Sequence, residues 1–124
     1  MALIKGGQEG KVIGLRADMD ALPITEVEDG RSHRSTKDGI MHACGHDTHT
    51  AILLGVAKVL YEIKDQIPGS VKFIFQPAEE GAPPGEEGGA SLMVKEGVLE
   101  NPSVDAIFGL HINSVLPVGM IGYK

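Results

Sequence analysis

The strongest constraint on the fold is one amphipathic segment near the middle of the chain, residues 47–64. Apolar side chains recur along it at steps of three and four residues, which places them on one face of a helix. They are Ala51, Leu54, Val56, Ala57, Leu60 and Ile63. Segments with the composition of β-strands precede and follow it, residues 11–17 (KVIGLRA) and 71–75 (VKFIF). We therefore expect a strand, then a helix that stops before Pro68, then a second strand.

The second half of the chain continues this alternation. Residues 90–99 have the pattern of a short helix, and residues 104–112 (VDAIFGLHI) are mostly apolar, as in a strand that is covered on both faces. Residues 118–123 are a candidate fourth strand. This order of elements predicts a layered α/β/α domain with a largely parallel or mixed sheet. In such sheets, functional sites form beyond the carboxyl ends of the strands.

Two segments are expected to be loops. Residues 25–39 are polar, rich in turn residues and without a clear period, which predicts a surface excursion. Residues 76–89 form a loop rich in glycine and proline. A chain of 124 residues is long enough for one small domain and not for two, so we expect a single domain over residues 1–124.

The charge of the chain argues against one class of partner. The 17 acidic and 11 basic residues give a net charge of −6, whereas a nucleic-acid-binding domain has a basic face. No apolar run approaches the ~20 residues of a membrane span. The first residues, MALIKGGQEGK, contain no apolar core of a secretory signal. We therefore expect a cytoplasmic protein that binds neither nucleic acid nor membrane.

The densest group of metal-binding side chains is MHACGHDTHT, residues 41–50. Only Gly45 separates Cys44 from His46, and in an extended loop alternate side chains point the same way, so both are able to contact one ion. A thiolate and an imidazole together suit Zn²⁺ and similar transition ions. Such a pair alone is more often structural than a metal site. His49 is expected in the first turn of the following helix and is given no ligand role.

A second group of candidates follows the strand expected at residues 71–75. Glu79 and Glu80 leave directly from this strand, whereas Glu86 and Glu87 have the pattern of a solvated loop edge. Adjacent side chains diverge, so one carboxylate is placed to bind an ion while its neighbour faces the water that the ion activates. This division suits metal-assisted hydrolysis, in which one glutamate is a ligand and the other a general base.

Two further candidates lie at other strand ends. A lone histidine at a strand end, such as His111, is more often structural, but the two groups above favour a ligand role for it. Asp18 closes the strand expected at residues 11–17. A carboxylate beside metal-bound imidazoles commonly orients the ring by accepting its free N–H. We assign that role to Asp18 and regard Asp20 as the less favoured candidate.

Four segments together resemble one enzyme family. LRADMDALPI (15–24), MHACGHDTH (41–49), IFQPAEEG (74–81) and GLH (109–111) are similar, in order and spacing, to motifs of the M20 metallopeptidases. They are most similar to the M20D branch, which comprises amidohydrolases of N-acyl amino acids, including indoleacetyl-amino-acid hydrolases. The resemblance covers almost the whole chain, so we expect residues 1–124 to be a partial M20-type catalytic domain.

The resemblance implies a role for each matched residue. The residues that match the family's metal ligands are Cys44, His46, Glu80 and His111. Glu79 matches the general base, and Asp18 matches the aspartate beside the metal site. The implied cofactor is a pair of divalent ions, Mn²⁺, Zn²⁺, Co²⁺ or Ni²⁺, or a single ion in so short a chain. The implied reaction is hydrolysis of the amide bond of an N-acyl amino acid, or a similar small amide, by a metal-activated water.

The chain also departs from the family. M20 enzymes are much longer, and they carry a lid domain with the dimer surface and an oxyanion-stabilising histidine, followed by one more metal-binding histidine. None of these is expected in 124 residues. Three hypotheses stay open: a minimal hydrolase, a truncated, non-catalytic fragment that binds metal without turnover, and a small metal-binding module. An incomplete sheet leaves an open edge or a bare apolar face, so we expect a homo-oligomer.

Overall fold

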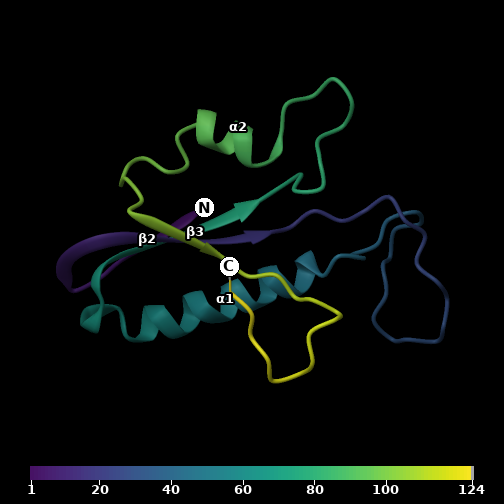
Figure 1. Ribbon diagram of the computed structural model, residues 1–124, viewed down its shortest axis with the longest axis horizontal. Coiled ribbons are helices and arrows are strands. Elements are labelled where there is room, and N and C mark those ends of the chain that lie inside the picture. The colour runs from purple at the N-terminus through teal and green to yellow at the C-terminus, as the bar shows by residue number, and fades with distance from the viewer. Residues whose placement is uncertain (124) are drawn as a thin grey trace.

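The computed structural model describes residues 1–123, and it has three layers (Figure 1). A four-stranded mixed sheet forms the middle layer, with one helix on each of its faces. The elements in chain order are β1 (Ala2–Lys5), β2 (Gln8–Asp18), α1 (His46–Glu62), a 3₁₀ turn (Lys64–Gln66), β3 (Pro68–Gln76), α2 (Gly89–Lys95) and β4 (Ala106–Gly109). The layered α/β/α domain with a mixed sheet is therefore confirmed.

The sheet has the strand order β1-β3-β2-β4. β2 pairs with β3 and with β4 in parallel, whereas β1 pairs with β3 antiparallel. Along the central pair, Leu15 lies opposite Phe73 and Asp18 lies opposite Gln76. The carboxyl ends of β2 and β3 therefore reach the same edge of the sheet, where the chain leaves both strands as loops.

The main core lies between the sheet and α1. Side chains alternate along a strand, so Val71 and Phe73 face this core while Lys72 and Ile74 face the other side. The buried members of the core are Ala17, Leu53, Val71 and Phe73, and the side chains of Leu15, Val56, Ala57 and Leu60 pack against them. The apolar face of α1 is rotated from the expected one, because Leu53 is buried and Leu54 is exposed.

Lys72 is an unusual buried residue on the α2 side of the sheet. Its side chain is 2% exposed, and its ammonium group donates to three backbone carbonyl oxygens of the turn that follows α2. The acceptors are Val98 at 3.1 Å, Glu100 at 2.7 Å and Pro102 at 2.8 Å. An ammonium group has three N–H donors, so every polar hydrogen of Lys72 has a partner.

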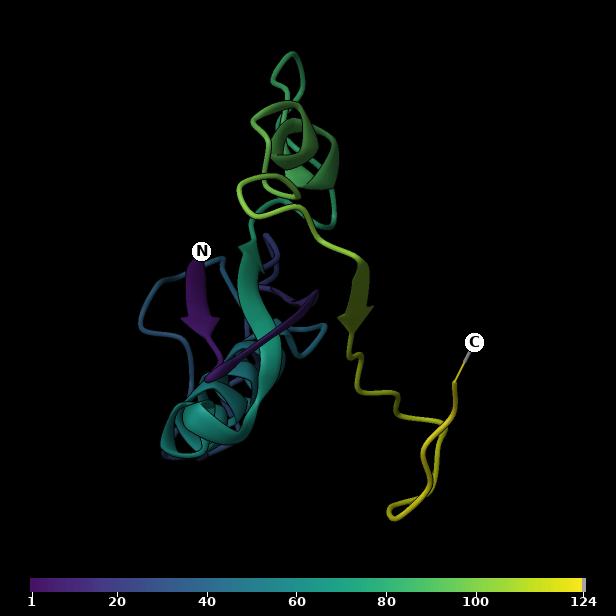
Figure 2. The same ribbon diagram turned by 90° about the vertical axis from the view of Figure 1, so that its left-hand side faces the viewer.

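Several expected elements differ in the structure. The last strand is β4, which is shorter than residues 104–112 and is not covered on both faces, since the side chain of Phe108 is 61% exposed. Residues 118–123 form no strand, and Figure 2 shows the segment after β4 running away from the sheet. α2 ends at Lys95 rather than at residue 99. β1 was not expected, because its four residues are exposed or half-buried and have no alternating pattern.

Within residues 1–123, no helix combines the length and the apolar composition needed to cross a membrane.

Candidate metal centre

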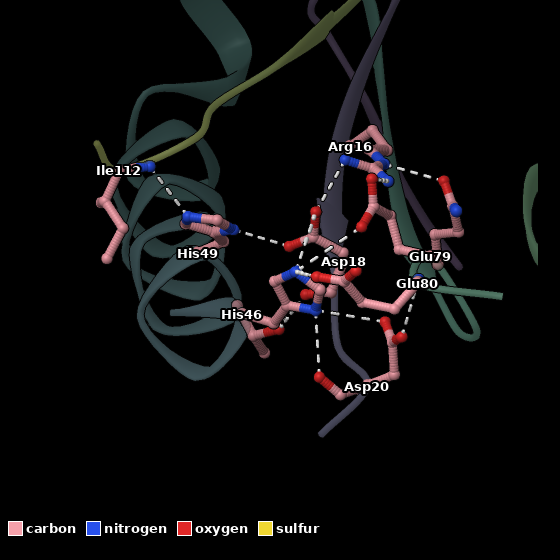
Figure 3. Close-up of polar contacts among 10 residues, drawn as sticks. Arg16, Asp18, Asp20, His46, His49, Glu79, Glu80 and Ile112 are labelled. Atoms are coloured by element: carbon pink, nitrogen blue, oxygen red, sulfur yellow. Dashed lines mark hydrogen bonds and ion pairs between the residues drawn. The ribbon is translucent and has the colours of Figure 1, made fainter. Parts of the chain in front are cut away.

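Most of the candidate site residues gather at one edge of the sheet. Figure 3 shows them converging from the carboxyl end of β2, from the loop that follows β3 and from the first turn of α1. This position agrees with the expectation that sites in layered α/β domains form beyond the carboxyl ends of strands. The expected grouping is present in space, since Cys44, His46 and Glu80 have donor atoms within 4.8 Å of one another and Glu79 lies 3.7 Å from His46.

His46 lies at the centre of the group and is the first residue of α1, with 1% of its surface exposed. Gly45 precedes it in the left-handed conformation, with φ at 87°. The left-handed backbone angle favours glycine here, and a Cβ at this position would also require the side chain of Ile112 to move. The sequence hypothesis of an extended Cys44–Gly45–His46 loop is thus replaced by a turn that starts a helix.

The Nδ1 atom of His46 is held by Asp20. It lies 3.0 Å from the backbone oxygen of Asp20 and 3.2 Å from Oδ1 of its carboxylate. The backbone N–H of Glu80 donates to the other oxygen of the same carboxylate, at 3.2 Å. Burial alone would raise the pKa of Asp20, but hydrogen bonds from the N–H groups of Glu79 and Glu80 lower the pKa overall. The sequence interpretation gave this orienting position to Asp18, and the structure places Asp20 there.

The Nε2 atom of His46 is buried and has no hydrogen-bond partner among residues 1–123. Three carboxylate oxygens surround it at distances too long for hydrogen bonds: Glu79 Oε2 at 3.7 Å, Asp18 Oδ2 at 3.8 Å and Glu80 Oε1 at 3.9 Å. An unpartnered buried polar atom normally signals a role or an absent partner. A cation among these four atoms would satisfy all of them.

Cys44 completes one group of donor atoms. Its Sγ atom, a ring nitrogen of His46 and a carboxylate oxygen of Glu80 all lie within 4.8 Å of one another. A hydrogen bond to the Glu80 carboxylate is the largest cause that raises the pKa of the Cys44 thiol, followed by burial and by the charges of Glu80, Glu79 and Asp18. The thiol keeps its proton beside these negative groups, and a bound cation would reverse that preference.

Asp18 and His49 form a second, fully buried part of the site. The Nδ1 atom of His49 lies 2.6 Å from Oδ1 of Asp18, and Arg16 donates to Oδ2 of Asp18 at 2.8 Å. Burial alone would raise the pKa of Asp18, but the hydrogen bond from His49 and the charge of Arg16 lower the pKa overall. Asp18, His46 and His49 also form a second group of donor atoms within 4.8 Å of one another. The sequence analysis did not assign His49 to any group of metal ligands.

Arg16 is another residue that sequence reasoning did not single out. Its guanidinium group donates to Gln76 at 2.8 Å as well as to Asp18, and it lies 3.8 Å from Oε1 of Glu79. Arg16 therefore links the ends of β2 and β3 and holds two of the carboxylates that face His46. The available signal in the sequence was Arg16 itself, two residues before Asp18 in RADMD.

The structure does not bring His111 into either group of donor atoms. His111 lies two residues beyond β4, and its ring packs against that of His49 with the centroids 4.9 Å apart. Its assignment as a metal ligand therefore stays a prediction.

A cleft of about 1280 Å³ opens beside the site. Cys44 and His111 both line it, together with residues 33–37 and 40–43. The segment 25–39, expected as a surface excursion, thus contributes a wall of this cleft. The size is ample for a small molecule, since ligand pockets commonly enclose roughly 300–1,000 Å³.

Comparison with known proteins decides the family. The model of the peptidase family M20/M25/M40 matches residues 14–124. The chain belongs to this family. Two of its M20 relatives are the thermostable carboxypeptidase 2 of Saccharolobus solfataricus, 50% identical over 98% of this chain, and an N-acyl-L-amino acid amidohydrolase of Geobacillus stearothermophilus, 49% identical over 98% of it. The chain spans only 29% and 31% of these two relatives.

One solved structure in the M20 family is also similar. It is a Bacillus subtilis protein, a dinuclear metal binding peptidase, which matches 98% of this chain with a TM-score of 0.86 and 49% sequence identity. The match covers 32% of that structure. This M20 chain therefore has the fold of one portion of a much longer relative.

The donor atoms of this M20 chain fit a divalent transition ion. One thiol, one imidazole nitrogen and one carboxylate lie close enough to share an ion, and thiolate with imidazole and carboxylate is a set that several such ions accept. The unpartnered Nε2 atom of His46 gives this fit an independent physical basis. The donor set does not distinguish among Mn²⁺, Zn²⁺, Co²⁺ and Ni²⁺.

Proposed function

We propose that this chain forms the metal-binding part of a hydrolase that cleaves the amide bond of N-acyl amino acids or similar small amides. The observation that carries the proposal is the buried Nε2 atom of His46, which has no partner and faces three carboxylates. A carboxypeptidase and an N-acyl-amino-acid amidohydrolase both act on amide bonds, so the chemistry shared by the relatives points the same way.

Cys44, His46 and Glu80 are the residues proposed to hold the first divalent ion, with Asp18 facing the same nitrogen of His46. We propose His111 as a further ligand, which fits its place on the wall of the cleft. When bound, the metal supplies Lewis acidity for the amide carbonyl and favours ionisation of the attacking water. Zn²⁺, Mn²⁺, Co²⁺ and Ni²⁺ are the candidates, and a pair of ions is proposed for the complete centre.

Glu79 is proposed as the general base. Its carboxylate lies 3.7 Å from His46 Nε2, is about one-third exposed and faces the guanidinium group of Arg16. In this position Glu79 is able to take a proton from the attacking water and to pass it to the leaving nitrogen. Arg16 would hold the carboxylate in place while it is charged.

The decisive experiment compares three glutamine substitutions. Hydrolysis of N-acetyl and N-benzoyl amino acids is measured together with metal content per chain. Glu79→Gln is expected to lower turnover by about 10²–10⁴-fold without loss of metal, because a general base contributes that much. Glu80→Gln is expected to lower metal content as well, and Glu86→Gln, in the exposed loop, to change neither. Equal turnover in wild type and Glu79→Gln would contradict the assignment.

The chain matches only a part of its relatives, and this favours an alternative function. Because it covers about 30% of them, a fragment that folds and binds metal without turnover is the alternative. We propose that residues 1–124 are one part of an M20 catalytic domain and that the lid domain and the remaining ligand lie outside it. Metal binding by a chain that hydrolyses none of the test amides would support this alternative.

We also propose a homo-oligomer and a cytoplasmic location. Exposed apolar side chains are concentrated on β4 and the segment after it, and a free apolar face favours association. Cys44 has to stay reduced to bind a metal, which favours a reducing compartment. A single monomeric species in light scattering at high concentration would contradict the first proposal. Partition of the native protein into an oxidising compartment would contradict the second.

A further inference from the structure

His49 makes two hydrogen bonds from a side chain that is 1% exposed. Its Nδ1 atom contacts Oδ1 of Asp18 at 2.6 Å, and its Nε2 atom lies 2.9 Å from the backbone N–H of Ile112. A backbone N–H only donates, so Nε2 is the acceptor. Nδ1 then carries the proton that is donated to Asp18. The two neighbours therefore select one neutral tautomer of the ring.

The bond to Ile112 joins residues 110–123 to α1. Within residues 1–123, it is the only hydrogen bond that joins residues 110–123 to the rest of the molecule. The other bonds of this segment are local ones, between Asn113 and Val115 or Leu116 and between Pro117 and Met120. Figure 2 shows how far this segment extends beyond the last strand. His49 thus fixes one point of this segment, Ile112, against α1.

That point is next to His111. The rings of His49 and His111 are in contact, and Ile112 also fills the space that Gly45 leaves open beside His46. Through its other nitrogen, His49 holds the Asp18 carboxylate, whose second oxygen faces His46 Nε2. Figure 3 shows this line of contacts from Ile112 through His49 to Asp18. One side chain therefore joins the proposed metal centre to the segment that carries His111.

We propose that His49 is a positioning residue that docks residues 110–113 beside the metal centre, so that His111 is held within reach of the ion. This inference rests on the proposed function, because it assigns His111 a role toward the metal. His49 itself is not a ligand in this proposal. Both of its ring nitrogens are occupied, one by Asp18 and one by Ile112.

Two substitutions separate the two bonds of His49. The amide of asparagine reaches the position of Nδ1, so His49→Asn keeps a donor for Asp18 and loses the acceptor for Ile112. The amide of glutamine reaches the position of Nε2, so His49→Gln keeps an acceptor for Ile112. Leu53→Ala, one turn further along α1, is the control for general destabilisation. Leu53 is a core residue and takes part in neither hydrogen bond of His49.

The measurements are hydrogen exchange of the Ile112 amide and the affinity of the protein for Co²⁺, followed by visible absorption against a competing chelator. His49→Asn is expected to lose protection at Ile112 and to bind Co²⁺ about 10–100-fold more weakly, as for other groups that orient ligands. His49→Gln is expected to keep the protection of the Ile112 amide and the Co²⁺ affinity within about threefold of wild type. Leu53→Ala is expected to leave these two quantities unchanged. Circular dichroism establishes that each variant is folded.

A double substitution tests the route through His111. His111→Ala is expected to weaken Co²⁺ binding as much as His49→Asn, and the two together to weaken it no further, since both remove the same contact. Unchanged Co²⁺ affinity in His49→Asn, or full additivity of the two losses, would overturn the inference and leave the metal centre standing. Failure of the wild type to bind Co²⁺ would instead overturn the proposed function, and the inference with it.

Discussion

Lys72 and His46 are both almost fully buried, but their polar atoms are satisfied to different degrees. Lys72, on the α2 side of the sheet, donates to three carbonyl oxygens and leaves no polar hydrogen without a partner. His46, at the start of the helix on the other side, has one bonded nitrogen and one without any partner. Every ammonium hydrogen of Lys72 has a partner within the chain, whereas the Nε2 atom of His46 has none among residues 1–123.

This difference underlies the proposal that Lys72 has a structural role and that His46 binds a metal. Burying a polar group costs free energy unless it is hydrogen-bonded, and the geometry around Lys72 meets that requirement. The three carboxylates around His46 do not meet it, because they stop 3.7–3.9 Å from Nε2. We therefore expect substitutions at Lys72 to change stability alone, and substitutions around His46 to change the response to metal.

The largest effect is expected for Lys72→Met. Removing the ammonium group leaves three carbonyl oxygens without their donor in a buried place, so the free energy of unfolding should fall by about 3–5 kcal/mol. Urea denaturation measures the loss. Lys58→Met, at an exposed position on α1, is the control and should stay within about 0.5 kcal/mol of wild type. A loss equally small in both variants would show that the Lys72 contacts contribute little.

The next effect is expected for His46→Asn, measured as the gain in stability on adding metal. Asparagine keeps a donor for the backbone oxygen of Asp20 and removes the unpartnered nitrogen. Wild type should gain about 2.7 kcal/mol at a metal concentration of 100 times Kd, and His46→Asn should gain almost none. Metal-free stability should differ little between the two. An equal gain in both proteins would place the ion elsewhere.

Cys44→Ser should give a smaller loss than His46→Asn. Serine replaces the thiol with a weaker ligand while Glu80 and His46 remain, so metal affinity should fall by about tenfold, or 1.4 kcal/mol. Isothermal titration with Zn²⁺ or Co²⁺ gives the affinity. An unchanged affinity for both ions would exclude Cys44 from the ligand set and leave the carboxylates and His46 as the centre.

The smallest effect is expected for Asp20→Asn. The backbone oxygen of Asp20 still accepts from His46 Nδ1, and an amide oxygen still accepts from the N–H of Glu80, but the amide NH2 group replaces the carboxylate oxygen that lies 3.2 Å from Nδ1. Stability and metal-binding free energy should each change by less than about 1 kcal/mol, as for one hydrogen bond of ordinary strength. A loss as large as that of His46→Asn would show that the negative charge of Asp20, and not its geometry, supports the ring.

Local pattern predicted the parts of this molecule that depend on neighbours in sequence. The helix that begins within MHACGHDTHT, the strand that contains VKFIF and the loop position of Glu79 and Glu80 all follow from residues within one short window. α1 begins at His46, one residue before the expected start, because a left-handed glycine sets the turn.

What could not be predicted depends on distant partners. β1 forms because its four residues pair with the free edge of β3, and no pattern within those residues predicts a strand. The sequence favoured Asp18 over Asp20 beside the ring of His46, whereas Asp20, two residues beyond the end of β2, is the one that contacts His46 Nδ1. The bonds of His49 join it to positions 31 and 63 residues away, and only the fold brings them together.

Those separations also distinguish two kinds of contact in the site. The contacts of Asp20 with His46 and of Asp18 with His49 close loops of 26 and 31 residues, whereas the bond of Ile112 to His49 spans 63. Closing a longer loop costs more entropy. During synthesis, every donor of the inner group, including Glu80, is made well before Ile112. The donors of the inner group therefore come from a shorter stretch of chain than the contact that docks residues 110–113.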